Sequence, residues 1–221
     1  MKLPFPEKRI WFNYSLLVFV VFSMFFVSFF PLSWHRQMYD WLFTIIYLNA
    51  ALAMEKYRKP ILIVAVIAMF FELGSTWLDL ETISFISRGL NVIFFVYIVF
   101  NFIFMIARSK EVNAKVILES INGYLLLGLV FSLMIASSMM YDPTSFKFPE
   151  TALVYSDQVN NFSDYLYYGL VTLSTLGYGD VVPTMPFSKS LSVFTSIAGQ
   201  LYIAIIIAML VGKYASQKNE D

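Results

Sequence analysis

Residues 175–180 of this 221-residue chain read TLGYGD, and this stretch decides how the rest of the sequence is interpreted. Glycine recurs at every second position, at Gly177 and Gly179. Glycine adopts positive φ without the steric cost that a Cβ imposes, so alternate residues can turn successive carbonyl groups toward one axis. A single file of backbone carbonyl oxygens can replace the hydration shell of a monovalent cation. The stretch therefore predicts a cation-coordinating loop rather than an ordinary glycine-rich turn.

The sequence on both sides of the stretch fits such a loop. Asn161 or Ser163 can cap a helix that runs through residues 165–172. This helix is too short to cross a bilayer, and re-entrant backbone is tolerated at membrane depth only where it is buried in protein or lines water. Its C-terminal carbonyl groups would favour a nearby cation. Residues 181–183 then return the chain to the surface, and residues 190–211 supply an apolar span of about 20 residues.

Helix, re-entrant helix, glycine-rich loop and helix, in this order, resemble the pore domain of the tetrameric potassium channels. The resemblance covers roughly residues 115–215 and is most specific over 172–183. It implies a homotetramer in a lipid bilayer, with K⁺ as the permeant ion and no cofactor. It also implies a selectivity filter in residues 175–179, where K⁺ would bind at Thr175, Leu176, Gly177 and Tyr178 and Gly179 would complete the filter.

The resemblance assigns supporting roles around this filter. In those channels aromatic residues of the pore helix hold the filter tyrosine outward, and Tyr167 and Tyr168 occupy the corresponding places. Some bacterial relatives carry a glutamate that binds the filter aspartate, but here that place is Val171, beside Thr172. Asp180 must therefore find another partner, for which the hydroxyl of Tyr168 is a candidate.

The last apolar helix is interpreted as the inner, pore-lining helix. Gly199 lies where relatives have a hinge glycine, although a small residue that lets two helices approach is the alternative. If the helix lines the pore, a 3.6-residue period through Gln200 selects further residues for the same face. An apolar inner mouth of this kind could gate by dewetting. The selected residues are Ile203 or Ala204, Ile207 and Val211.

The composition agrees with an all-α integral membrane protein, because 59% of the residues are hydrophobic and 14% are charged. Windows of about 20 residues predict six transmembrane helices, with the re-entrant helix between the fifth and sixth. There is no cysteine, so disulfides and thiolate metal sites are excluded. His35 falls in a predicted loop, where we expect an exposed side chain rather than a ligand. The predicted spans are 11–30, 38–54, 61–78, 89–107, 116–140 and 188–212.

The basic residues predict the orientation of these helices. Eleven of the 15 lie on the side that also holds both termini, which the positive-inside rule makes cytoplasmic. This places the outer end of the filter outside the cell. We expect a multi-pass protein of the plasma or inner membrane, and the compact chain looks prokaryotic. The eleven are Lys2, Lys8, Arg9, Lys56, Arg58, Lys59, Arg108, Lys110, Lys115, Lys213 and Lys218.

We divide the chain near residue 110, into a four-helix membrane bundle (1–110) and a pore domain (111–221). In six-span relatives the bundle is a voltage sensor whose fourth helix carries arginine at every third position. Here Arg88 and Arg108 only bracket the fourth predicted span, so the bundle resembles a voltage-sensor domain without its arginines. Glu72, in the third span, is either a proton-sensitive or coupling site or a neutral or snorkelling carboxyl that could pair with Arg88. Because only about nine residues follow Gly212, we expect no cytoplasmic ligand domain.

The sequence thus predicts a potassium-selective channel that is gated neither by a conventional voltage sensor nor by a cytoplasmic ligand domain. A non-selective cation channel and a silent modulatory subunit stay open as alternatives, although both glycines and the tyrosine of the filter are intact. A potassium-uptake transporter subunit would carry four such loops. No His, Cys or paired-carboxylate cluster at ligand spacing suggests an enzyme, and we expect no nucleic-acid partner.

Overall fold

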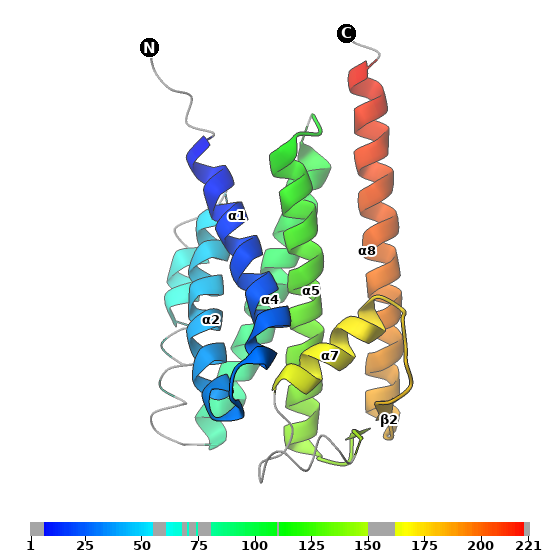
Figure 1. Cartoon of the computed structure of the whole chain (residues 1–221). Helices are drawn as coiled ribbons and strands as arrows, with labels where there is room; N and C mark the ends of the chain where they lie inside the picture. Colours follow the sequence, from blue (N-terminus) through cyan, green and yellow to red (C-terminus); the bar gives the residue numbers. More distant parts are fainter. Residues whose placement is uncertain are drawn as a thin grey trace.

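The computed structural model describes residues 7–54, 61–67, 70, 74, 81–109, 111–149 and 162–218. Most of the described helices run side by side, and α1 begins at the same end of the molecule at which α8 ends (Figure 1). Two short strands form one antiparallel pair. The elements are α1 (Glu7–Val21), η1 (Phe22–Phe26), η2 (Val27–Phe29), α2 (Leu32–Ala53), α4 (Glu81–Arg108), α5 (Ala114–Tyr141), β1 (Phe146–Lys147), α7 (Phe162–Leu173), β2 (Val182–Pro183) and α8 (Pro186–Lys218).

Among the described residues, four helical stretches are long and apolar enough to cross a membrane. They correspond to the first, fourth, fifth and sixth predicted spans. The second predicted span lies within α2, which carries more polar side chains and is not one of the four. The third predicted span is described only over 61–67, 70 and 74, and Glu72 lies outside the described residues. The four stretches are Ile10–Phe29, Gly89–Arg108, Ala114–Tyr141 and Pro186–Gln217.

Local sequence explains where the last two long helices begin. The Asn113 side chain accepts a hydrogen bond from the Val116 amide at 3.1 Å, which caps α5 after a short turn from α4. Ser188 Oγ accepts from the Met185 amide at 3.0 Å, and Pro186 has no N–H to satisfy in the first turn of α8. α8 is longer at both ends than the predicted span: it begins at Pro186, and it continues to Lys218 because the residues after Gly212 include no proline or further glycine.

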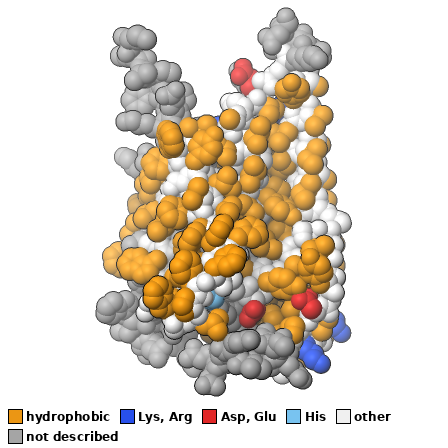
Figure 2. Space-filling model, in the orientation of Figure 1, with side chains coloured by type: hydrophobic (Ala, Val, Ile, Leu, Met, Phe, Trp, Pro, Cys, Tyr) orange, Lys and Arg blue, Asp and Glu red, His pale blue; other side chains and the backbone are white. Residues whose placement is uncertain are grey.

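One of two apolar clusters joins α1, α2 and α4 to α5, and so crosses the boundary predicted near residue 110. Tyr47, Phe95 and Leu126 are among its fully buried side chains. Between α5 and α1, Asn122 Nδ2 donates to the Asn13 carbonyl oxygen at 2.9 Å. The four-helix unit and the pore unit of the prediction therefore share packing within one chain. On the face shown in Figure 2, apolar side chains cover the middle and charged side chains lie near the two ends.

The end of α8 that is distant from the glycine-rich loop is attached to the turn between α4 and α5. Lys213 Nζ donates to the carbonyl oxygens of Ile106 and Ala107, the latter at 2.9 Å, and contacts Ser109 Oγ at 3.2 Å. A cation at the C-terminus of α4 complements the negative end of that helix. One turn further along α8, Gln217 Oε1 accepts from the amide of Val112 at 3.1 Å. The sequence marked Lys213 only as a cytoplasmic charge.

Candidate functional site

Helix α7 is the platform of the candidate site. It has 12 residues and lies obliquely across α5 toward α8 (Figure 1). Its approach to α5 depends on Gly169, since a Cβ there would lie 2.5 Å from Ser132 Oγ and 3.3 Å from the Ser132 amide nitrogen. The Ser132 hydroxyl is itself satisfied, because it donates to the Gly128 carbonyl at 2.8 Å. The short helix expected before the glycine-rich loop is therefore present and closely packed.

The amide groups that follow α7 fold back onto its last turn. The Val171 carbonyl accepts hydrogen bonds from the amides of Leu176 at 3.0 Å and Gly177 at 3.2 Å. The Thr172 carbonyl accepts from the Thr175 amide at 3.0 Å. Both carbonyl groups are thus hydrogen-bonded to the loop, and the expectation that this end of the helix favours a nearby cation stays a prediction. Val171 and Thr172 thus support the loop through their backbone, independently of their side chains.

The sign of φ alternates along the backbone of the loop. Thr175, Gly177 and Gly179 have φ of 60°, 55° and 80°. The two glycines adopt such angles freely, but a β-branched residue at positive φ is strained, at a cost on the order of 1–3 kcal/mol. Among the described residues, no backbone amide donates to a carbonyl oxygen of residues 175–179. The loop therefore directs amides toward α7 and leaves its row of carbonyl oxygens available to a ligand.

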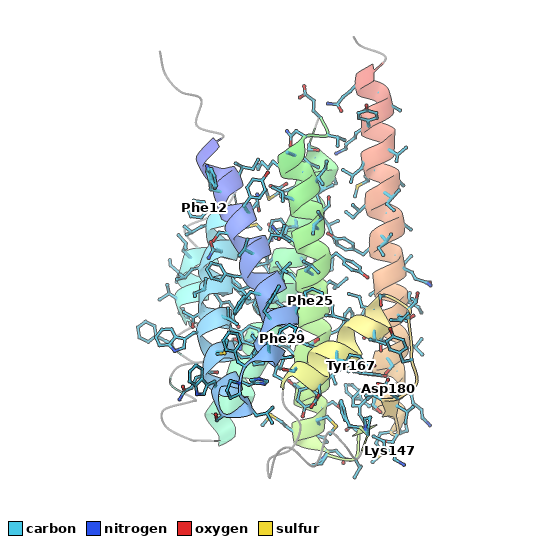
Figure 3. All side chains as sticks on the ribbon, viewed as in Figure 1. Phe12, Phe25, Phe29, Lys147, Tyr167 and Asp180 are labelled. Carbon is cyan, nitrogen blue, oxygen red and sulfur yellow. The ribbon has the colours of Figure 1, made fainter. Side chains whose placement is uncertain are left out.

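Tyr167 connects α7 to the C-terminal end of the loop. Its hydroxyl donates to Asp180 Oδ2 at 2.6 Å, and its ring stacks on Tyr178 with the centroids 6.4 Å apart and the planes 7° from parallel. Figure 3 shows Tyr167 on α7 next to Asp180. The hydrogen bond from Tyr167 lowers the pKa of the Asp180 carboxyl, and the same bond raises the pKa of Tyr167 to about 12. The prediction that the Tyr168 hydroxyl binds Asp180 was therefore wrong.

Tyr168 instead holds α7 against neighbouring elements. Its side chain is buried, its hydroxyl lies 2.7 Å from Ser192 Oγ on α8, and its ring meets Phe146 edge-on at 5.1 Å between centroids. Neither Ser192 nor Phe146 was identified from the sequence, and no local pattern marks them. Within one chain, only one tyrosine of the adjacent pair therefore reaches the loop.

The chain leaves the loop through a fixed turn. β2 pairs with β1 in antiparallel register, with Lys147 opposite Val182, and the Thr184 amide donates to the Ser145 carbonyl at 3.0 Å. The partner segment is shaped by Asp142, whose carboxylate accepts from the Thr144 amide at 2.8 Å and from the Thr144 hydroxyl at 2.6 Å. These bonds lower the pKa of Asp142. Both ends of the loop are thus anchored to the same body of helices.

On α8, Gly199 packs directly against the last turn of α7. A Cβ there would lie 2.0 Å from the Leu173 carbonyl oxygen, so this glycine is required for packing, and α8 runs through it as one unbroken helix. A hinge at Gly199 stays a prediction. Tyr202 faces the chain, since its hydroxyl donates to the Ser120 carbonyl at 2.8 Å. The residues predicted to line a pore are all exposed on α8: Gln200, Ile203, Ala204, Ile207 and Val211.

The described residues around this loop do not assemble side-chain ligands for a metal ion. Within the described ranges, no group of three or more His, Cys, Asp or Glu side chains could hold a metal ion. The oxygen atoms that the site offers to a cation are therefore backbone carbonyls and the Thr175 hydroxyl. Such a set of uncharged oxygens suits a monovalent cation that exchanges its hydration shell for carbonyl dipoles.

Comparison with known proteins supports a membrane channel. Residues 121–215, a little under half of the chain, match a family model described as ion channel. Over 36 residues the chain is 42% identical to a protein named potassium channel K2 from Plasmodium berghei (strain Anka), a match that covers 16% of this chain and 2% of that protein. The chain thus corresponds to a small part of that relative. No solved structure matches the chain. The matched segment and the apolar helices together indicate an all-α membrane protein with an ion-channel segment.

Proposed function

We propose that the chain is one subunit of a potassium-selective channel whose filter consists of residues 175–179. The observation that carries the proposal is the division of the loop backbone, with amides bound to α7 and carbonyl oxygens left without backbone donors. The alternating positive φ at Thr175, Gly177 and Gly179 is the geometry that turns carbonyl groups toward one side. K⁺ would be held by the oxygens of residues 175–178. The chemistry is passive coordination and release, so we propose no enzymatic activity.

The site is incomplete in one chain, and we propose that four copies complete it. Leu176 and Tyr178 are 56% and 67% exposed in the isolated chain, although their loop lies between apolar helices. One loop supplies one side of each carbonyl ring, and a rotational four-fold axis is the simplest way to close the ring. The exposed face of α8 that holds Gln200 and Ile207 would then line the cavity below the filter.

The proposed channel has no conventional voltage sensor. Between Gly89 and Arg108, α4 contains no charged residue, and the Arg108 guanidinium lies 4.0 Å from the centroid of the Phe104 ring at the helix end. Steep gating requires several charges, each worth about 2.3 kcal/mol per 100 mV. We therefore propose that voltage changes the open probability only weakly. The assembly would lie in a plasma or inner membrane, with both termini in the cytoplasm.

Reversal potentials of the purified protein in planar bilayers test this function. With K⁺ on one side and Na⁺ on the other, the wild-type reversal potential should lie close to the K⁺ equilibrium value. Tyr178→Asp removes the ring that stacks on Tyr167, so it should widen the outer filter and shift the reversal potential toward zero. A wild-type value near zero would identify a non-selective cation channel, and the absence of current would favour a modulatory subunit.

A further inference from the structure

Tyr202 differs from its neighbours on α8. Its side chain is 6% exposed, whereas those of Leu201 and Ile203 are 54% and 42% exposed. Between residues 200 and 217 of this helix, Tyr202 and Ile206 are the two residues that are buried. The C-terminal half of α8 therefore has little contact with the rest of its chain, and a tyrosine provides part of it.

A notch on α5 receives this tyrosine. The Tyr202 hydroxyl donates a buried hydrogen bond to the Ser120 carbonyl oxygen at 2.8 Å. The notch exists because residue 123 is glycine: a Cβ at Gly123 would overlap the Tyr202 hydroxyl and would lie 3.2 Å from Tyr202 Cζ and 3.5 Å from Phe102 Cβ. The Tyr124 ring lies beside the Tyr202 ring, at 5.8 Å between centroids. Glycine within a helix is less stable than alanine, so the hydroxyl that it admits explains a glycine in the middle of α5.

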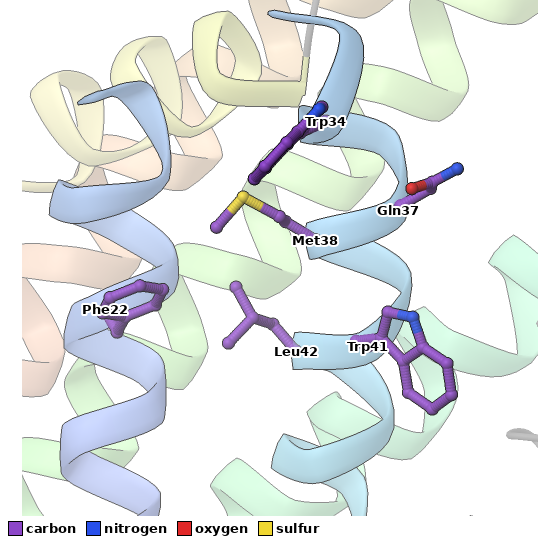
Figure 4. Close-up of a pocket in the computed structure, with 6 residues that line it drawn as sticks. All are labelled: Phe22, Trp34, Gln37, Met38, Trp41 and Leu42. Carbon is purple, nitrogen blue, oxygen red and sulfur yellow. The ribbon is translucent and has the colours of Figure 1, made fainter. Parts of the chain in front are cut away.

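The notch holds the tyrosine in one position. It is filled by the hydroxyl, in contrast with the groove of about 280 Å³ that stays open between η1 and α2 (Figure 4). If the C-terminal half of α8 moved away from α5, the hydroxyl would leave its acceptor within apolar surroundings. A buried polar group without a partner is costly, so the bond between Tyr202 and Ser120 opposes such a movement.

Tyr202 and the predicted pore-lining residues lie on opposite faces of α8. At 3.6 residues per turn, Val211 lies about 180° around the helix from Tyr202, and Ile207 lies about 140° from it. Lys213, which binds a carbonyl oxygen at the end of α4, lies about 20° from Tyr202. These two attachments therefore hold the C-terminal half of α8 on the side opposite to the exposed Ile207 and Val211.

We propose that Tyr202 is a positioning residue that favours the open channel, because its bond to Ser120 holds the C-terminal half of α8 away from the four-fold axis. The inference rests on the proposed function. Closure requires that the apolar side chains of Ile207 and Val211 from four subunits approach one another, which excludes water from the mouth of the pore. Such an approach moves α8 away from α5 and withdraws Tyr202 from the notch. Loss of the hydroxyl should therefore shift the equilibrium toward the closed channel.

Single-channel recording of the reconstituted protein with Tyr202→Phe tests the inference. The variant keeps the ring and loses the hydrogen bond, so we expect the open probability to fall at least threefold. The reversal potential and the unitary current should be unchanged, because the filter is untouched. Tyr214→Phe, which removes a hydroxyl from an exposed ring on the same helix, is the control and should keep the wild-type open probability. An open probability that is unchanged or higher in Tyr202→Phe would overturn the inference.

Gly123→Ala tests the notch itself. Its Cβ would displace the Tyr202 hydroxyl, so this variant should also lower the open probability at least threefold. In the double variant with Tyr202→Phe no hydroxyl remains to be displaced, and the open probability should equal that of Tyr202→Phe alone. If the two effects multiplied instead, the glycine and the hydroxyl would act independently, and the inference would be overturned.

A change at the mouth of the pore separates a role in gating from a general role in stability. Val211→Ser makes the mouth polar and so weakens its dewetted state. When added to Tyr202→Phe, it should restore at least half of the open probability that the loss of the hydroxyl removed. A protein that was merely less stable would not recover in this way, so a failure to recover would overturn the inference.

Distances between subunits test the same movement without a current. The chain has no cysteine, so spin labels can be attached at Ser216→Cys alone, near the end of α8. The distances between labels should shorten when Tyr202→Phe is added. Unchanged or longer distances would overturn the inference, whether or not the channel conducts. A complete lack of K⁺ current in the wild type would instead overturn the proposed function.

Discussion

Helices α5 and α8 are both long and apolar, yet they relate to the rest of the chain in different ways. In the apolar stretch of α5, 67% of the residues are buried, whereas in that of α8 the share is 22%. α5 is surrounded by α1, α4 and α7, whereas α8 contacts its own chain along one face and exposes Val193, Ile203 and Ile207 on others. Hydrophobicity identifies both as membrane helices. It does not distinguish a helix whose surface is covered within its own chain from a helix whose exposed faces additional subunits would cover.

The largest expected effect comes from the contact that fixes α8 to α7. Gly199→Ala would place a Cβ 2.0 Å from the Leu173 carbonyl oxygen, and relief of such a clash costs about 1–3 kcal/mol. We expect a lower midpoint of thermal unfolding in detergent and loss of most K⁺ current. Gly212→Ala is the matched control, since nothing lies within 4 Å of its new Cβ, and it should raise stability by about 0.5–1 kcal/mol. Equal stability of the two variants would mean that α7 and α8 are not in close contact in the assembled protein.

The sequence predicted the features of the pore segment that depend on local pattern. The loop at 175–180, the short helix before it and the apolar helices around it follow from spacing and hydrophobicity, which act over a few residues. The partner of Asp180 did not follow, because adjacent residues of a helix point about 100° apart and only tertiary packing decides whether Tyr167 or Tyr168 faces the loop. The partners of Tyr168, Ser192 and Phe146, lie on separate elements.

The sequence also did not predict the burial of His35 or the contacts of Lys213. The polar residues around His35 made the start of α2 resemble a loop, but burial against Tyr39 and the Phe30 carbonyl places the histidine within a helix. The sequence marked Lys213 only as a cytoplasmic charge and did not indicate its bonds to carbonyl groups at the end of α4. The contacts of Lys213 join residues more than 100 positions apart and leave no local signal in a single sequence, whereas those of His35 are with near neighbours and are set by where α2 begins.

The C-terminal end of α8, which the proposed orientation makes its inner end, offers a second test of how α8 is attached. Lys213→Met removes the donor to the carbonyl groups of Ile106 and Ala107 while it preserves most of the side-chain volume. The contact is partly exposed, so we expect a loss of about 1 kcal/mol in stability and faster hydrogen exchange in the last turns of α8. Lys189→Met, near the outer end of the same helix, is the control and should leave that exchange unchanged. Slow exchange in Lys213→Met would show that the inner end is held by other contacts.

The smallest expected effect concerns pH at the loop. The hydrogen bond from Tyr167 lowers the pKa of Asp180, so the stabilising bond is present above the ordinary pKa of a carboxyl and is lost as pH falls through the lowered value. Tyr167→Phe should move the acid-induced loss of unitary K⁺ current to higher outer pH. On the alkaline side, the pKa of Tyr167 is about 12, so deprotonation should not weaken the bond below about that pH.

Tyr168→Phe is the matched control for this pH effect. It removes a hydroxyl contact with Ser192 on α8 and leaves Asp180 untouched. The acid response of its unitary current should therefore equal that of the wild type, while its unfolding midpoint falls slightly. If both variants shift the acid response equally, the Tyr167–Asp180 bond is not its cause.

Anomalous scattering from Tl⁺, which replaces K⁺ in carbonyl-oxygen sites, tests the central claim most directly. In crystals of the assembled protein grown with Tl⁺, we expect a row of anomalous peaks on a four-fold axis, each within bonding distance of carbonyl oxygens of residues 175–178. Removal of Tl⁺ in favour of Na⁺ should eliminate the row. Peaks confined to carboxylate side chains such as Asp142, or a loop that carries no peak in Tl⁺, would contradict the claim that these carbonyl oxygens form a potassium filter.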